Sequence, residues 1–119
     1  MPINKTLQRV AAVSLVAVAA VAGATVSASA AEGNWNVTAS STCVATEQVQ
    51  LINGHDYMQV DPNSNGGGCQ FGIWDWNNSR WVYGPTTYGG LSGWYYDGPG
   101  YNMSVCAQDG GAWVCGPAN

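Results

Sequence analysis

The chain has 119 residues, of which 8% are charged, and its formal net charge is −4. All seven carboxylates lie beyond residue 31, where Arg80 is the single Lys or Arg, so that part of the chain has a net charge of −6. Proteins that bind nucleic acids or anionic membranes use clusters of Lys and Arg, so this balance excludes both functions.

The first 30 residues predict a secretory signal peptide. Lys5 and Arg9 precede the apolar run Val10–Val26, and the small-residue sequence ASA ends at Ala30. The alternative is an uncleaved membrane anchor, but the run is slightly short for a membrane span and no basic cluster follows it. Its Ala and Val content resembles that of signal peptides from high-GC bacteria. We therefore expect a secreted, extracellular protein with one small domain, residues 31–119, and no membrane contact after cleavage.

The domain itself predicts an all-β fold. Gly, Asn, Asp, Pro and Ser interrupt it about every eight to twelve residues, with β-branched and aromatic residues between them. This pattern is typical of a small, disulfide-stabilised antiparallel sandwich or barrel built from hairpins. The first hairpin joins segments 43–52 and 55–61 through Asn53-Gly54, because both positions of a type I′ turn need positive φ.

A weak calcium-loop candidate follows this hairpin. Asp61, Asn63 and Asn65, followed by a glycine, match the first half of a calcium-binding loop, in which alternate oxygens converge on the ion. The twelfth position is Gly72, where such a loop needs a bidentate Glu, and Pro62 interrupts the segment. We interpret it as an ordinary flexible loop and predict no metal site.

The second predicted hairpin is the ring-rich segment FGIWDWNNSRWVYG, residues 71–84. A loop centred on residues 78–79 would place Trp76 opposite Trp81 and Trp74 opposite Tyr83. One face would then carry Trp74, Trp76, Trp81 and Tyr83. The other would carry Phe71, Ile73, Asp75 and Val82. Alternation does not decide which face packs inward.

The aromatic content bears on the same question. The chain has six Trp, six Tyr and one Phe, whereas Val, Leu, Ile and Met are scarce in the domain. We expect roughly half of the rings to lie in the core. In the consecutive pair Tyr95-Tyr96, at least one ring should lie near the surface, because neighbouring side chains on a strand point opposite ways.

Two further hairpins complete the predicted fold. A turn at Asp97-Gly98-Pro99-Gly100 would place Tyr96 opposite Tyr101 and Trp94 opposite Met103. A loop at Gly110-Gly111 would place Cys106 directly opposite Cys115, within disulfide distance. The four cysteines of an exported domain predict two disulfides. By elimination, Cys43 pairs with Cys69.

The sequence offers little for catalysis or for a cofactor. His55 is the single histidine, and the adjacent Asp56 would point to the opposite face of a strand, where it could not orient the imidazole. Asp75 and Asp97 lie among aromatic residues, but a sheet this small seldom encloses the cleft that a catalytic carboxylate pair needs. We predict a non-enzymatic protein without a cofactor.

Rings near Asp, Asn and Gln suit sugars, because the apolar face of a pyranose stacks on Trp and the polar groups bind its hydroxyls. We therefore predict that the protein binds extracellular or cell-wall glycans. The predicted ligand-binding residues are Trp74, Trp76, Trp81, Tyr83 and Asp75. The same rings could anchor a protein interface. The alternatives are thus a small inhibitor of a secreted protease or amylase, which would use the turn at residues 97–100, and a surface or structural protein. The sequence leaves the oligomeric state open.

Overall fold

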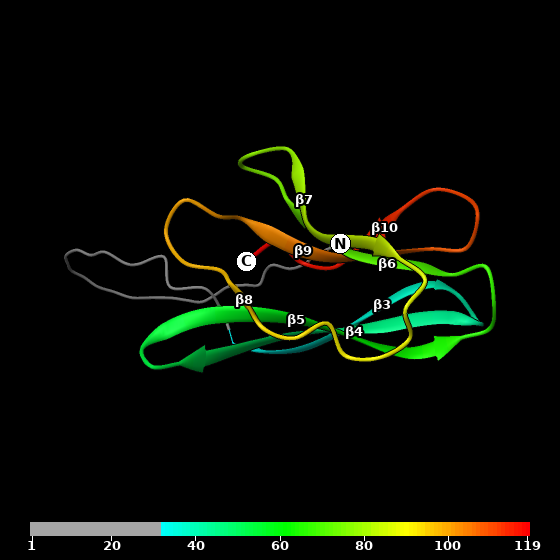
Figure 1. Ribbon diagram of the computed structural model, residues 1–119, viewed down its shortest axis with the longest axis horizontal. Helices are drawn as coiled ribbons and strands as arrows, with labels where there is room; N and C mark the ends of the chain where they lie inside the picture. The colour runs from blue at the N-terminus through cyan, green and yellow to red at the C-terminus, as the bar shows by residue number, and fades with distance from the viewer. Residues whose placement is uncertain (1–31) are drawn as a thin grey trace, which may run out of the picture. The chain divides into compact units, whose positions relative to one another are not determined.

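The computed structural model describes residues 32–119, so the predicted signal peptide lies outside the described residues. Residues 32–119 form two antiparallel four-stranded sheets that pack face to face, as the two layers in Figure 1 show. The β9 sheet has the order β10-β9-β6-β7 and the β4 sheet has the order β3-β4-β5-β8. The strands are β3 (Gly33–Ser40), β4 (Cys43–Ile52), β5 (His55–Asn65), β6 (Gln70–Asp75), β7 (Arg80–Thr86), β8 (Tyr95–Tyr96), β9 (Met103–Gln108) and β10 (Val114–Cys115). The predicted all-β fold is confirmed, and none of these residues belongs to a helix that could span a membrane.

Strands β4 and β5 form the predicted first hairpin. Asn53 (φ 52°) and Gly54 (φ 81°) both adopt the left-handed conformation of a type I′ turn, and Ile52 pairs with His55. Strand β3, which the sequence analysis did not predict, pairs with the other edge of β4. Its inward Val37 and outward Asn36 show the alternation of a half-buried strand.

Strands β6 and β7 form the second predicted hairpin, but in a different register. Trp74 pairs with Trp81 and Asp75 pairs with Arg80, so the prediction that Trp76 lies opposite Trp81 is wrong. The cause is the carboxylate of Asp75, which accepts hydrogen bonds from the backbone N–H of Asn77 (3.1 Å) and the side chain of Asn78. These bonds begin the turn directly after Asp75, and Trp76 becomes a loop residue.

The third predicted hairpin does not form. Strand β8 pairs with β5, where Tyr57 faces Tyr96, while β9 has β6 on one side and β10 on the other. The predicted turn does contain a hydrogen bond from the backbone N–H of Tyr101 to the carbonyl of Gly98 (3.1 Å). However, residues 97–102 connect one sheet to the other, because both edges of β9 already have partners.

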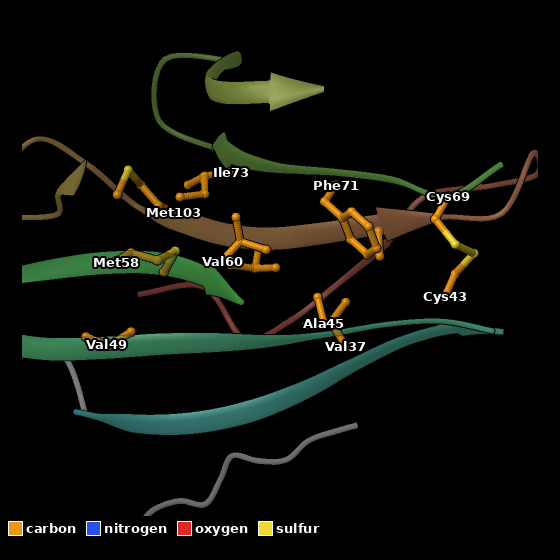
Figure 2. Close-up of a cluster of buried hydrophobic side chains, with 12 residues drawn as sticks. Val37, Cys43, Ala45, Val49, Met58, Val60, Cys69, Phe71, Ile73 and Met103 are labelled. Carbon is orange, nitrogen blue, oxygen red and sulfur yellow. A yellow bond between two sulfur atoms is a disulfide. The ribbon is translucent and has the colours of Figure 1, made fainter. Parts of the chain in front are cut away.

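The fourth hairpin and both predicted disulfides are confirmed. Cys115 pairs with Cys106 across β10 and β9, and these two cysteines are bonded to each other. The second bond joins Cys43 at the start of β4 to Cys69, which directly precedes β6. This disulfide therefore connects the two sheets, at one end of the core in Figure 2.

The core is more aliphatic than the sequence analysis predicted. Among residues 32–119, Phe71 is the single fully buried aromatic ring, and it lies among Val, Ile, Met and Ala side chains between the two layers (Figure 2). Four other rings pack against this cluster while partly exposed: Trp35, Tyr83, Tyr95 and Tyr101. Tyr95 is one of these and Tyr96 is 39% exposed, as predicted for that pair. Eight rings therefore lie outside the core.

We predict that the two disulfides contribute unequally to stability. Cys43–Cys69 spans 26 residues and Cys106–Cys115 spans 9, so the first restricts the unfolded chain more. Replacing Cys43 and Cys69 together by Ala should lower the free energy of unfolding by about 1 kcal/mol more than replacing Cys106 and Cys115. Urea unfolding of the two double variants measures this difference. Equal losses would show that native packing, rather than loop length, sets the contribution of each bond.

Candidate functional site

Four tryptophans lie together on the outer face of the β9 sheet. We call Trp74, Trp76, Trp81 and Trp113 the tryptophan cluster. Phe71 and Ile73 are fully buried, and the alternation of β6 therefore directs Trp74 outward. Trp81 pairs with Trp74 and shares its face. This resolves the open question about the hairpin, because the face with Phe71 and Ile73 packs inward.

The rings of the tryptophan cluster form a continuous chain of contacts. The ring centroids of Trp76 and Trp74 are 6.3 Å apart, those of Trp74 and Trp81 are 5.1 Å apart, and those of Trp81 and Trp113 are 4.8 Å apart. The planes of successive rings meet at 79°, 72° and 53°. The rings therefore pack edge to face, as aromatic pairs prefer, rather than forming one flat surface.

Two features of neighbouring residues hold these rings in place. The indole Nε1 of Trp76 donates a hydrogen bond to Ser104 Oγ (2.9 Å), and the backbone N–H of Trp76 donates to the carbonyl of Asn102 (2.8 Å). Trp76 is nevertheless 49% exposed. Trp81 lies over Gly72, where a Cβ atom would stand 2.7 Å from the ring, so this contact requires glycine. The indole of Trp76 is thus half exposed, while hydrogen bonds to Ser104 and Asn102 fix its position.

The tryptophan cluster contains three of the five predicted ligand-binding residues: Trp74, Trp76 and Trp81. Tyr83 leaves this face, because a bulge at Val82 turns it inward, where it pairs with Ile73 and contacts the ring of Tyr95 at 5.5 Å. Burial, with smaller contributions from Tyr95 and Tyr88, raises the pKa of Tyr83.

The sequence analysis missed Trp113. The signal was present, because a loop at Gly110-Gly111 places Trp113 opposite Gln108. That register puts its ring on the same face as Cys106, and β9 pairs with β6 there. Including Trp113 extends the tryptophan cluster from the β6–β7 hairpin across the sheet toward β10.

Asp75 is fully buried and does not reach the surface of the tryptophan cluster. Besides Asn77 and Asn78, it accepts a hydrogen bond from the backbone N–H of Asn102 (3.2 Å). Burial alone would raise the pKa of Asp75, but the hydrogen bonds from Asn78, Asn102 and Asn77 together lower it below the ordinary value. Its carboxylate therefore connects the β6–β7 loop to the segment that leads into β9.

A second group of rings lies at the edge of the β4 sheet. Tyr96 contacts His55 and Tyr57, each with centroids 5.7 Å apart, and Tyr101 at 6.0 Å. His55 is an exposed residue beside the first turn. Tyr96 lies over Gly98, so the turn at residues 97–100 is covered on one side by this ring.

Two carboxyl groups are buried without a positive partner among residues 32–119. Glu47 lies between the sheets, and its Oε1 accepts a hydrogen bond from the backbone N–H of Val105 (2.7 Å). Burial raises the pKa of Glu47 well above its ordinary value, although the bond from Val105 opposes this, and the charge of Asp97 adds to it. Asp97 is 3% exposed, and burial, reinforced by Asp56 and Asp75, raises its pKa to about 8. Burial thus favours the neutral form of both groups.

The calcium-loop candidate adopts a different conformation. Asp61, Asn63 and Asn65 lie in strand β5, whose extended backbone spreads alternate side chains along the sheet instead of gathering them around an ion. The side chain of Asn63 accepts a hydrogen bond from Thr46 Oγ1 (2.7 Å). The prediction of a flexible loop at this position is wrong up to Asn65, because the segment pairs with β4.

We predict that Asp97 makes the protein less stable as the pH rises from about 4 to 8. In this range the unfolded carboxyl ionises, whereas the folded one stays neutral up to about pH 8. Stability should fall by at most about 1.4 kcal/mol per pH unit for this one proton. Asp97→Asn should raise the melting temperature at pH 8 and flatten this slope.

The control is Asp109→Asn, which removes the same charge from an exposed position. Thermal unfolding of the three proteins between pH 4 and 8 gives the comparison. If neither Asp97→Asn nor Asp109→Asn changes the slope of stability against pH, Asp97 is ionised in the folded protein.

Comparison with known proteins assigns the chain to no family. No protein-family model, no curated protein and no solved structure matches the chain. Its function therefore has to be inferred from the chemistry of the tryptophan cluster and of the buried carboxyl groups.

Proposed function

We propose that this is a secreted, non-enzymatic protein that binds extracellular or cell-wall glycans through the tryptophan cluster. The observation that carries the proposal is the continuous contact of four indole rings on one outer sheet face, with Trp76 49% exposed. Trp74, Trp81 and Trp113 are half-buried. Rings that gather around an exposed ring on a small domain usually mark a binding surface. The predicted signal peptide and the two disulfides support a function outside the cell.

The chemistry of the surface suits a sugar chain. Indole faces stack on the apolar C–H faces of pyranose rings. Asn77 and Asn78 lie exposed in the loop that begins at Trp76, and Arg80 is exposed at the start of β7. The side chains of Gln70 and Gln108, which pair across β6 and β9, form a further polar group through a 3.0 Å hydrogen bond. These amides and the guanidinium can bind hydroxyl groups while the rings bind the apolar faces.

The ring angles and the charge narrow the class of glycan. Because the ring planes meet at 53–79°, the tryptophan cluster fits a single bent sugar chain better than the flat surface of a crystalline polysaccharide. The net charge of −6 in the domain opposes the approach of polyanions. We therefore favour an uncharged or weakly charged soluble glycan.

A non-enzymatic role is supported by the placement of the carboxyl groups. Glu47 and Asp97 have raised pKa values, as a general acid would, yet they are 0% and 3% exposed and cannot approach a substrate at the surface. Within residues 32–119, no three His, Cys, Asp or Glu side chains lie close enough together to hold a metal ion. The proposal therefore assigns binding, and no reaction, to this protein.

The turn at residues 97–100 supports a second candidate function, inhibition of a secreted hydrolase. The backbone N–H of Asp97 donates to the carbonyl of Asp56 (2.9 Å), the ring of Tyr96 covers Gly98, and Pro99 is exposed. A fixed, exposed turn is what an inhibitor presents to an active site, because little conformational entropy is then lost on binding.

Tryptophan fluorescence of the exported protein, titrated with soluble glycans, tests the first proposal. We expect a saturable spectral shift with at least one glycan. Trp76→Ala should fold, because the ring is half exposed, and should weaken binding at least about tenfold. The control is Trp94→Ala, which removes an indole that is 36% exposed and lies outside the tryptophan cluster.

Equal binding by the two Trp variants would refute the site. If no glycan shifts the spectrum, the glycan proposal is wrong, and inhibition assays with secreted proteases and amylases then test the turn at residues 97–100.

Export and processing give a separate prediction. When the full chain is expressed with its own N-terminal segment, the protein recovered outside the cell should begin at Ala31 and contain no free thiol. Intact-mass spectrometry with and without reduction measures both properties. A mass that retains residues 1–30 would contradict the signal-peptide prediction without affecting the proposed binding surface.

A further inference from the structure

The four edge strands of the two sheets are protected to very different degrees. Strands β8 and β10 have two residues each, and β7 begins with Arg80 and contains Pro85. Short strands, charges and proline are devices that prevent a sheet edge from pairing with another chain. Strand β3 has eight residues and contains neither a charged residue nor a proline. It is therefore the one edge, among residues 32–119, that lacks these devices.

The side chains of β3 divide cleanly between its two faces. Asn34, Asn36 and Thr38 are exposed on the outer face, whereas Trp35 and Val37 pack against the core. One edge of β3 is paired with β4. Among residues 32–119 no strand pairs with the opposite edge, so alternate backbone N–H and C=O groups point outward there.

We infer that β3 is a self-association edge, at which two copies of this chain pair their β3 strands antiparallel about a two-fold axis beside Asn36. The two β4 sheets then become one continuous sheet with twice the number of strands. Backbone hydrogen bonds between the strands supply the contact, as in other cases of strand addition. The interface is isologous, since the same strand is used by both copies.

The register follows from the strand itself. In antiparallel pairing about a two-fold axis, opposed residues share a face, so the axis must pass beside a residue and not between two residues. The register of β3 with β4 is regular from Gly33 to Thr38, and an axis beside Asn36 pairs residues 34–38 of the two copies, all of which lie within this regular part. Asn34 of one copy then faces Thr38 of the other, and Asn36 faces its own counterpart.

Self-pairing fits the charge distribution better than pairing with a charged partner. Gly33–Ser40 contains no charged residue, so no like charges face each other across the axis. The remaining repulsion is long-range, from a net charge of −6 on each domain, and salt screens it. Dimerisation should therefore become stronger as the salt concentration rises, whereas recognition of a cationic partner would become weaker.

The symmetry also has a consequence for ligand binding, which rests on the proposed function. Because the two-fold axis is perpendicular to the β4 sheet, both β9 sheets lie on the same side of the continuous sheet. The two tryptophan clusters therefore face the same side, and one glycan chain long enough to reach both is bound more tightly than by a single copy.

Sedimentation equilibrium of the exported protein over a dilution series tests the inference without any glycan, so its failure is distinguishable from failure of the proposed function. We expect a monomer–dimer equilibrium that shifts toward dimer with added salt. Asn36→Lys should weaken dimerisation at least about tenfold, because like charges then face each other across the axis. The matched control, Gln50→Lys, places the same charge on the same outer face but on β4, and should dimerise as the wild type does.

A mixing experiment then tests the register. Asn36→Asp should also be monomeric, and mixing it with Asn36→Lys should restore a dimer, because the two introduced side chains at position 36 carry opposite charges. Both variants change an exposed side chain, and circular dichroism checks that they fold. A wild-type protein that stays monomeric at all concentrations and salt levels would overturn the inference. So would a failure of the mixed, folded variants to associate.

Discussion

The buried carboxylate of Asp75 is the interaction on which the arrangement of this protein most depends. It accepts hydrogen bonds from Asn77, Asn78 and Asn102, and so joins the β6–β7 loop to the segment that enters β9. The early turn that these bonds impose sets the register in which Trp74 faces Trp81. An ionised group inside a small sandwich is costly unless it is fully hydrogen-bonded, and Asp75 meets this condition.

The three buried carboxyl groups of the sandwich have pKa values shifted in opposite directions. Hydrogen-bond donors surround Asp75 and favour its charged form, whereas burial favours the neutral forms of Glu47 and Asp97. Glu47 connects the sheets through one bond to Val105, at a point where the pairing between β9 and β10 has ended. The polar groups thus join loops and layers, while the aliphatic core holds a single fully buried ring and leaves the other aromatic residues at least partly exposed.

The sequence predicted those parts of the fold that residue types specify locally. Asn53-Gly54 requires positive φ at two positions, and Gly110-Gly111 places Cys106 opposite Cys115, so both hairpins and both disulfides could be derived. The partners of β8 could not, because two residues carry no pattern and their pairing with β5 depends on packing far away in the chain. The predicted register of β6 and β7 was wrong, because the hydrogen bonds to Asp75 begin the turn before Trp76 can pair with Trp81. Strand alternation correctly placed Trp74, Trp76 and Trp81 on one face. It misplaced Tyr83, because no residue type indicates the bulge at Val82.

The strand order of the two sheets also has a consequence for how the protein folds. Strands β3, β4 and β5 are consecutive in the chain and adjacent in their sheet, so this meander needs only short loops to close. The β9 sheet instead requires β9 to find β6 across a separation of 38 residues between Gln70 and Gln108. Closing a long loop before its contacts form is slow, so we expect the β4 sheet to form early and to serve as the surface on which β6 and β9 meet.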